Sequence, residues 1–238
     1  MVNLKNIDQK VLWYTVGIIV TDGSLSVDKR HIYITSKDED LLVMLRDQLG
    51  LAVKIGKKSN GRTQEKIYSV LQFSDVNLYH FLENIGLFSN KSLTLNKIDV
   101  PERHFKDFVR GVIDGDGSIM TWQHASNGHM QWALKITSGA PVFASWLHEQ
   151  MVKYYKVKGK IYTYQYKDKK NPIHIIKFGK VATKIILTES YYPECIALER
   201  KKRKAEECLR SENGWSKYGT MKNMPGCWNG RQARLKID

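Results

Sequence analysis

The stretch RGVIDGDGSI, residues 110–119, decides the fold, because it closes an apolar run with two aspartates and three glycines. A glycine inside a helix costs about 1 kcal/mol relative to alanine, and the helix dipole disfavours a carboxylate in the last turn. A second, degenerate copy, TVGIIVTDGSL, occupies residues 15–25. In both copies an internal glycine, Gly17 or Gly111, stands six residues before the final glycine. We expect two buried helices whose internal glycines let their backbones approach closely, helix against helix.

Each copy heads a similar half of the chain. HIYITS (31–36) is patterned as a strand and KDEDLLVMLRDQLG (37–50) as a helix, and WALKITS (132–138) and GAPVFASWLHEQM (139–151) repeat that order. Two more strands and a helix complete each half, at 52–58, 66–74 and 75–86 in the first and at 157–166, 173–179 and 180–188 in the second. The order α-β-β-α-β-β-α therefore occurs twice, which indicates an internal duplication with pseudo-twofold symmetry.

This order predicts an α+β fold of two pseudo-symmetric halves, each with a four-stranded antiparallel sheet, and with the two motif helices packed at the central interface. We expect an N-terminal half over residues 1–96 and a C-terminal half over 97–210, ending in a helix at 193–210. Residues 211–238 form a basic extension rich in Gly and Asn. Its basic and aromatic residues suit either a clamp on a phosphate backbone or a loosely ordered tail, and the sequence leaves both open.

The charge balance points to a polyanionic partner. The 238 residues carry 38 Lys+Arg against 24 Asp+Glu, a net charge of +14. Such an excess favours a nucleic acid as partner, and the alternative is a basic surface that binds nothing. Between residues 153 and 184 there are ten lysines and one aspartate.

The cysteines and the apolar runs exclude other classes. The three cysteines, Cys195, Cys208 and Cys227, form no CxxC pair, so neither a zinc site nor a disulfide framework is expected and a reducing, intracellular compartment fits best. No run approaches the ~18 uninterrupted apolar residues of a membrane span, and the N-terminus lacks the pattern of a signal peptide. We therefore expect no membrane partner.

Packing of the motif helices would place Asp22 and Asp116 side by side at adjacent helix C-termini. Each carboxylate would then face the negative end of a helix dipole and a second negative charge. A cation between them removes both penalties, and a hard divalent ion held by carboxylate and carbonyl oxygens is the natural choice. The alternative is that each Asp-Gly only makes a tight turn into the following strand, but two copies at matching positions favour the cation.

Two of the expected strands alternate in a way that suits DNA. KGKIYTYQY (158–166) and KIYSVLQF (66–73) each place basic, aromatic or amide side chains on one face. Such a face suits the major groove, where Lys, Arg, Gln and Asn read base edges, and the alternative is a solvated charged surface. The residues expected to contact DNA are Lys29, Arg30, Tyr33, Lys54, Lys57, Lys58, Arg62, Lys66, Tyr68, Gln123, Lys135, Lys158, Lys160, Tyr162, Tyr164 and Tyr166.

TVGIIVTDG and VRGVIDGDGSI resemble the two signature motifs of the LAGLIDADG homing endonucleases, in their single-chain, two-motif type. The resemblance covers residues 8 to 205 and includes the Gly-Leu-Phe-Ser-Asn-Lys-Ser connection at 86–92. It implies a monomer whose two sheets form a DNA-binding saddle. It also implies Mg²⁺-dependent cleavage of both strands of a long, asymmetric DNA target across the minor groove.

The resemblance also assigns residues. It makes Asp22 and Asp116 the metal ligands, with the carbonyls of Thr21 and Gly115 beside them. A polar residue ending the second strand and a Lys or Gln on the fourth strand of each half would organise the attacking waters. By position these residues are Ser36, Ser138, Gln72 and Lys177. Mn²⁺ is expected to substitute for Mg²⁺, and Ca²⁺ to support binding without cleavage.

The sixth motif residue, often acidic in the family, is Asp114 in the second copy and Val20 in the first. We interpret Asp114 as structural, so that Val20 leaves catalysis possible but makes the two active sites unequal. Two alternatives stay open: an RNA maturase that assists splicing of a group I intron, with intron RNA as partner, and a DNA-binding regulator without catalysis. An intron-encoded protein of a bacterial or phage cytoplasm and one of an organelle matrix or stroma both fit the sequence.

Overall fold

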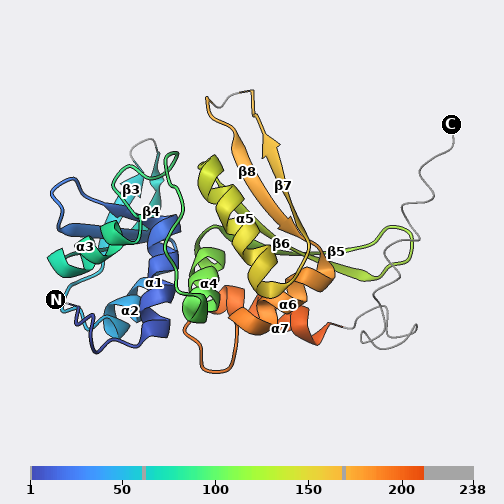
Figure 1. The fold of residues 1–238 in the computed structure, drawn as a ribbon, viewed down its shortest axis with the longest axis horizontal. Helices are drawn as coiled ribbons and strands as arrows, with labels where there is room; N and C mark the ends of the chain where they lie inside the picture. Colours follow the sequence, from blue (N-terminus) through green and yellow to red (C-terminus); the bar gives the residue numbers. More distant parts are fainter. Residues whose placement is uncertain (1, 61–62, 168–169, 212–238) are drawn as a thin grey trace.

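The computed structural model describes residues 2–60, 63–167 and 170–211 (Figure 1). The predicted extension 211–238 lies outside the described residues, apart from Ser211. Among the described residues no helix is long and apolar enough to cross a membrane.

Each half contains the predicted order of elements. The first half contains α1 (Gln9–Asp22), β1 (Gly23–Leu25), β2 (His31–Ser36), α2 (Glu39–Gln48), β3 (Gly56–Asn60), β4 (Thr63–Ser74) and α3 (Val76–Asn84). The second contains α4 (Phe105–Asp116), β5 (Gly117–Gln123), β6 (Met130–Ser138), α5 (Pro141–Tyr155), β7 (Gly159–Tyr164), β8 (Ile173–Phe178), α6 (Lys180–Ser190) and α7 (Glu199–Arg210), after a short 3₁₀ turn at Glu102–His104.

The two sheets repeat one topology in matching register. Their strand orders are β1-β2-β4-β3 and β5-β6-β8-β7, and every neighbouring pair is antiparallel. Gly23 pairs with Ile34 and Gly117 with Ile136, each glycine directly after its motif helix. The predicted α+β fold with two four-stranded antiparallel sheets is confirmed. The division into residues 1–96 and 97–210 stays a prediction.

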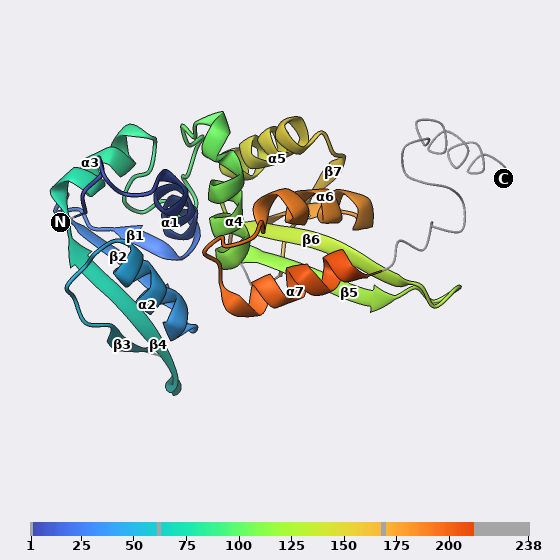
Figure 2. The ribbon, with the colours of Figure 1, turned by 90° about the horizontal axis from the view of Figure 1, so that it is seen from below.

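The described helices pack on one face of each sheet, and none of them lies over the other face, which is called the open face below. In β2 the side chains of Ile32 and Ile34 are fully buried, whereas the alternate residue Tyr33 is only half-buried. In β6, Ile136 is buried and Lys135 half-buried in the same alternation. Figure 2 shows α2 lying over β2 and β4, and α6 and α7 lying over the β5–β6 pair.

α1 and α4 cross at the centre of the molecule, glycine against glycine, as predicted (Figure 2). A Cβ atom on Gly17 would lie 2.3 Å from the Phe108 carbonyl oxygen, and one on Gly111 would lie 2.2 Å from the Tyr14 carbonyl oxygen. Real Cβ atoms do not approach carbonyl oxygens this closely, so any larger residue would force the two helices apart.

The last helix begins later than expected. Residues 193–198 are turn and extended chain, and α7 starts at Glu199. The reason is that this segment is anchored on α4: the Leu198 N–H donates to the buried Asp114 carboxylate at 2.7 Å. A helix over 193–198 would use that N–H internally instead.

Candidate functional site

Asp22 and Asp116 end α1 and α4, at the same side of the glycine crossing. A Cβ on Gly115 would lie 1.9 Å from the Thr21 hydroxyl oxygen and 3.1 Å from a carboxylate oxygen of Asp22. Gly115 therefore leaves the room in which Thr21 and Asp22 pack beside the last turn of α4. Asp22 is half-buried and Asp116 exposed, so solvent and ligands reach both carboxylates.

The two carboxylates resist ionisation in the protein alone. Burial and the charge of Asp116 raise the pKa of Asp22 to about 6. Burial also raises the pKa of Asp116, although Lys201 and Lys91 oppose that shift. Desolvation and like charge both favour the neutral acid, and a bound cation would restore the ionised form. The pair therefore has the electrostatics of a cation site.

Two buried lysines that neither motif predicts complete the cluster. The Lys201 ammonium donates to the carbonyls of Ile113, Asp114 and Gly115 at 2.7, 2.6 and 3.0 Å, which uses all three of its N–H donors at the end of α4. The Lys91 ammonium donates to the carbonyl of Gly23 at 2.6 Å, directly after α1. Both cations lie where a helix dipole favours them.

Both lysines belong electrostatically to the aspartate pair. Burial lowers the pKa of Lys91 to about 8 and that of Lys201 to about 8, whereas the charges of Asp22 and Asp116 oppose both shifts. Pseudo-symmetry was the available signal: Lys91 and Lys201 each lie in the segment that follows the last sheet-covering helix of its half. The number of residues between that helix and the lysine differs between the halves, so the sequence does not show that the two lysines correspond.

The donor set fits Mg²⁺. No group of three or more His, Cys, Asp or Glu residues that could hold a metal occurs within residues 2–60, 63–167 and 170–211. Mg²⁺ is commonly held by one or two carboxylates, with waters and substrate phosphates as its other ligands, and Asp22 and Asp116 are carboxylates of that kind. The Gly115 carbonyl, a predicted ligand, already accepts a bond from Lys201 and has one lone pair left. Thr21 lies beside it, and its role as a ligand stays a prediction.

Asp114 has a structural role, because its carboxylate accepts hydrogen bonds that hold other segments against α4. Its buried carboxylate accepts from the hydroxyls of Tyr14 and Tyr191 at 2.8 and 2.6 Å, and from the Leu198 N–H. It thereby ties residues 191–198 to α4, and that segment leads into the turn of α7 that carries Lys201. Val20, at the same position of α1, is buried in the apolar core instead.

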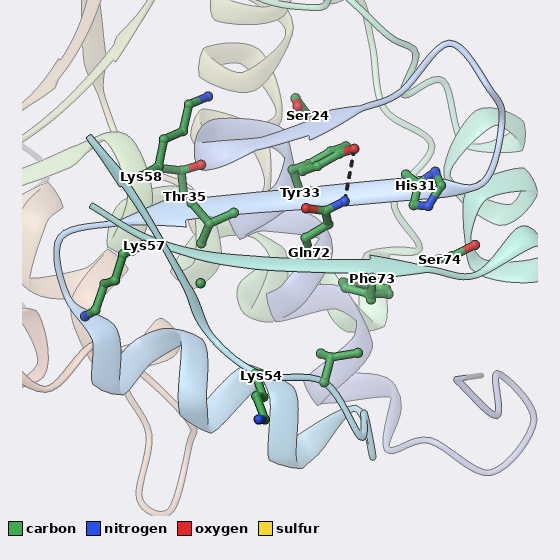
Figure 3. Close-up of a pocket in the computed structure, with 13 residues that line it drawn as sticks. Ser24, His31, Tyr33, Thr35, Lys54, Lys57, Lys58, Gln72, Phe73 and Ser74 are labelled. Atoms are coloured by element: carbon green, nitrogen blue, oxygen red, sulfur yellow. Dashed lines mark hydrogen bonds between the residues drawn. The ribbon is translucent and has the colours of Figure 1, made fainter. Parts of the chain in front are cut away.

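Gln72 and Lys177 occupy equivalent positions. Gln72 pairs across β2–β4 with Tyr33, and Lys177 pairs across β6–β8 with Lys135. The Gln72 amide donates to the Tyr33 hydroxyl at 3.3 Å (Figure 3). These side chains lie on the open face, two strands away from the strand that follows each motif helix. Their part in organising water stays a prediction.

Ser36 and Ser138 also match, and both have local partners. The Ser36 hydroxyl accepts from the Asp38 N–H and the Ser138 hydroxyl from the Ala140 N–H, each at 3.1 Å. Each serine thus shapes the turn into the next helix, and its strand parity is that of the covered face. The structure shows this turn-forming role, and a catalytic role stays a prediction.

The open face of the first sheet is hollowed. A concavity of about 830 Å³ lies over β2, β3 and β4. Its lining includes Ser24, His31, Tyr33, Thr35, Lys54, Lys58 and Gln72, which Figure 3 shows along the strands. Tyr33, Lys58 and Tyr68 of the expected DNA contacts lie on this face by register, and Lys29 and Arg30 lie exposed in the β1–β2 turn.

Lys57 lies on the opposite side of β3 from Lys58 by register, although it also lines the concavity, and its contact with DNA stays a prediction. It pairs with Ser69, which is buried on the covered side, and its ammonium contacts Glu39 of α2 and the Ser69 hydroxyl, the latter at 3.0 Å. The alternation of the strand sends Lys58 to the open face and Lys57 to the helix. Figure 3 shows the Lys57 side chain directed toward α2. Lys54 precedes β3 and lies in no strand.

In the second sheet most of the expected contacts lie on the open face. Lys135, Lys160, Tyr162 and Tyr164 do so by register, while Lys158 and Tyr166 flank β7. Gln123 pairs with Met130, whose parity is that of the buried Trp132, so by register it lies on the helix-bearing side, but its side chain is exposed and its contact with DNA stays a prediction. Arg62 and the side chain of Lys66 lie outside what the structure describes.

The LAGLIDADG-like domain family matches residues 10–86, the first of the two halves. Solved structures extend the likeness to both halves. The chain has the LAGLIDADG fold. A structure of mesophilic variants of the homing endonuclease I-DmoI aligns with a TM-score of 0.53 and 16% identity, over 83% of this chain and 97% of that one.

Two further LAGLIDADG structures show how widely the fold is shared. The homing endonuclease I-GzeII in complex with its DNA target aligns with a TM-score of 0.52 and 13% identity, over 82% of this chain and 87% of that one. Full-length DUF199/WhiA from Thermatoga maritima aligns with a TM-score of 0.52 and 13% identity, over 94% of this chain and 66% of that one. No curated protein matches the sequence.

Proposed function

We propose that this protein is a site-specific DNA endonuclease that hydrolyses one phosphodiester bond on each strand of a long, asymmetric duplex. The observation that carries the proposal is the cluster of Asp22, Asp116, Lys91 and Lys201 at the ends of the crossed motif helices. Two carboxylates that solvent reaches, with two buried ammonium groups beside them, suit a phosphodiester and a divalent cation together. Relatives in fold, such as I-DmoI in complex with DNA and Ca, support the choice of DNA as substrate.

Each residue of the cluster has a place in the reaction. Asp22 and Asp116 would hold Mg²⁺, which when bound supplies an activated water and neutralises charge on the departing oxygen. Lys91 and Lys201 fix the helix ends that carry the two carboxylates, and their charge favours a phosphate beside them. The minor groove is only about 6 Å wide, so adjacent helix ends can serve both strands across it.

The two open sheet faces would hold the flanking duplex in its major groove, because antiparallel sheets can bury one face and offer the other. We further propose that the protein acts as an intracellular, intron-encoded monomer with Mg²⁺ as its metal and with Mn²⁺ as a substitute. The maturase and the inactive DNA-binding regulator are the competing proposals, and no feature of the described residues favours RNA over DNA.

The test is a selection from random duplex DNA in Ca²⁺, followed by Mg²⁺ and mapping of the ends. We expect an enriched long, asymmetric site that is cut on both strands. Asp22→Asn and Asp116→Asn should abolish cutting and keep binding, whereas Asp47→Asn, an exposed carboxylate on α2, should change neither. Enrichment without cutting in Mg²⁺ or Mn²⁺ would establish a DNA-binding protein instead. If no duplex is enriched, the same selection is run on a pool of structured RNA, and enrichment there alone would favour the maturase.

A further inference from the structure

The open face of the second sheet carries a row of three lysines. Lys135 pairs directly with Lys177, and Lys177 pairs directly with Lys160, so the row crosses β6, β8 and β7. Among the described residues no carboxylate forms an ion pair with any of the three. Like charges directly opposite each other on a sheet are destabilising. The row therefore has the form of a site for a polyanion.

No such row occurs among the described side chains of the first sheet. The positions of Lys135 and Lys177 correspond to Tyr33 and Gln72, a neutral pair joined by a hydrogen bond. The strand pairing is the same in both sheets at these positions. The two open faces therefore differ here in their side chains and not in their backbone. The two open faces therefore offer different chemistry to whatever binds them.

Apolar side chains flank the lysine row on both sides. Met120 and Trp122 of β5 lie on the open face beyond it, 38% and 42% exposed, and Tyr162 and Tyr164 of β7 lie on the opposite side, 38% and 47% exposed. Ala133, the partner of Met120, is small and leaves the methionine free to be contacted.

The first sheet lacks these residues as well. Register places Gly56 and Lys58 where the second sheet has Tyr162 and Tyr164. β1 ends at Leu25 after three residues, whereas β5 continues for seven residues, so no counterpart of Trp122 exists on β1. An exposed methionine and tryptophan are thus found only on the described open face of the second sheet, whereas that of the first carries Tyr33 and Tyr68.

The lysine row and the apolar side chains that flank it together indicate what binds the open face of the second sheet. Ammonium groups bind phosphates, and the one apolar group on the base edges of the major groove is the thymine methyl. We propose that the second half recognises a thymine-rich half-site through methyl contacts of Met120, Trp122, Tyr162 and Tyr164, while the first half reads its half-site through hydrogen bonds. This inference rests on the proposed binding of duplex DNA, but not on cleavage.

The test replaces dT by dU, which removes the methyl and leaves the pairing unchanged. Full-length protein is titrated in Ca²⁺ with the selected site carrying dU in one half-site or the other. The half-site under the second sheet is identified as the one whose protection is reduced by Lys160→Ala. We expect about a fourfold weaker Kd for each contacted methyl removed there, the effect of one buried methyl group, and no change from dU in the other half.

A variant pair makes the test specific. Met120→Ala with Trp122→Ala should bind dT and dU sites more nearly alike, with thermal unfolding unchanged because both side chains are exposed. Val76→Ala, an apolar residue of similar exposure on α3, should keep the full discrimination. Equal effects of dU in both halves, or none in either, would overturn the inference. Methyl discrimination without cutting in Mg²⁺ would uphold it and refute the endonuclease, and failure to bind any duplex would refute both.

Discussion

Gly17 and Gly111 touch across the crossing of α1 and α4, and a Cβ on either would lie 2.9 Å from the other's Cα. Gly17→Ala and Gly111→Ala should each lower the free energy of unfolding by about 3 kcal/mol, at the upper end of the cost of overpacking, because the clashing atoms are backbone. Urea unfolding of each variant measures this.

Gly179→Ala is the matched control, since nothing lies within 4 Å of a Cβ at that position and its φ is ordinary. Gly179 is the N-cap of α6, where alanine is disfavoured, so that variant should lose no more than about 1 kcal/mol. Wild-type stability of Gly17→Ala would show that the helices are free to separate there.

Asp22→Asn should stabilise the metal-free protein at neutral pH. The pKa of Asp22 is raised from 3.8 to about 6, so the folded state holds its proton more tightly than the unfolded state does. Stability is therefore lost as pH rises from about 4 to about 6, and the variant escapes that loss. At pH 7 in a chelator we expect a gain of about 1–2 kcal/mol, discounted for the solvent that reaches a half-buried side chain.

Below pH 4 the two proteins should unfold alike, because neither then carries a charge at residue 22. Excess Mg²⁺ should reverse the order at pH 7 by stabilising only the wild type. Thermal unfolding at pH 3.5 and pH 7, with and without Mg²⁺, measures both effects. A variant less stable than wild type at pH 7 in a chelator contradicts the electrostatic account.

Lys201→Met should be strongly destabilising, since it removes three charge-assisted hydrogen bonds from the end of α4. Unpaired buried carbonyls cost about 1–3 kcal/mol each when water cannot reach them, so a loss of about 3 kcal/mol is expected. Lys202→Met, at the next and half-buried position, should cost little in the same urea titration. Similar losses for the two variants would mean that the helix-end bonds contribute nothing special.

Arg200 and Asp38 join the two halves by an ion pair in which Nε donates to Oδ1 at 3.1 Å and Nη2 donates to Oδ2 at 2.9 Å. A double-mutant cycle with alanine at both positions should give a coupling of about 0.5–1 kcal/mol, because the arginine is exposed. Arg200 also lowers the pKa of Asp22, so Arg200→Ala should raise that pKa further in an NMR titration. An unchanged Asp22 titration would mean that Arg200 does not act on the site.

Much of the fold could be predicted from the sequence because the internal duplication repeats each helix and strand. β2 was predicted with its exact residues, 31–36, since Ile-Thr-Ser ends it and an acidic helix start follows. The start of α7 was not readable, because residues 193–198 are held extended by a hydrogen bond to Asp114, far away in the sequence. Long-range contacts of this kind override local helix propensity.

The candidate site, too, contains some residues that the sequence predicts and others that it does not. The places of Asp22 and Asp116 follow from a local motif and a glycine spacing that a single sequence displays. Lys91 and Lys201 reach the helix ends from segments that only the folded chain brings there. The sequence did not reveal that Lys57 and Gln123 lie on the helix-bearing side of their strands, because one residue of strand register decides which face a side chain occupies and composition does not set register.

The unequal hairpins have a final consequence. β5 and β6 span seven and nine residues, whereas β1 and β2 span three and six. At about 3.3 Å per residue the second arm is longer by roughly 10 Å. The two halves of this pseudo-twofold protein are thus unequal. Rotating the protein by 180° on a DNA duplex would not reproduce the same contacts. A DNA site bound by this protein would therefore be bound in one orientation only.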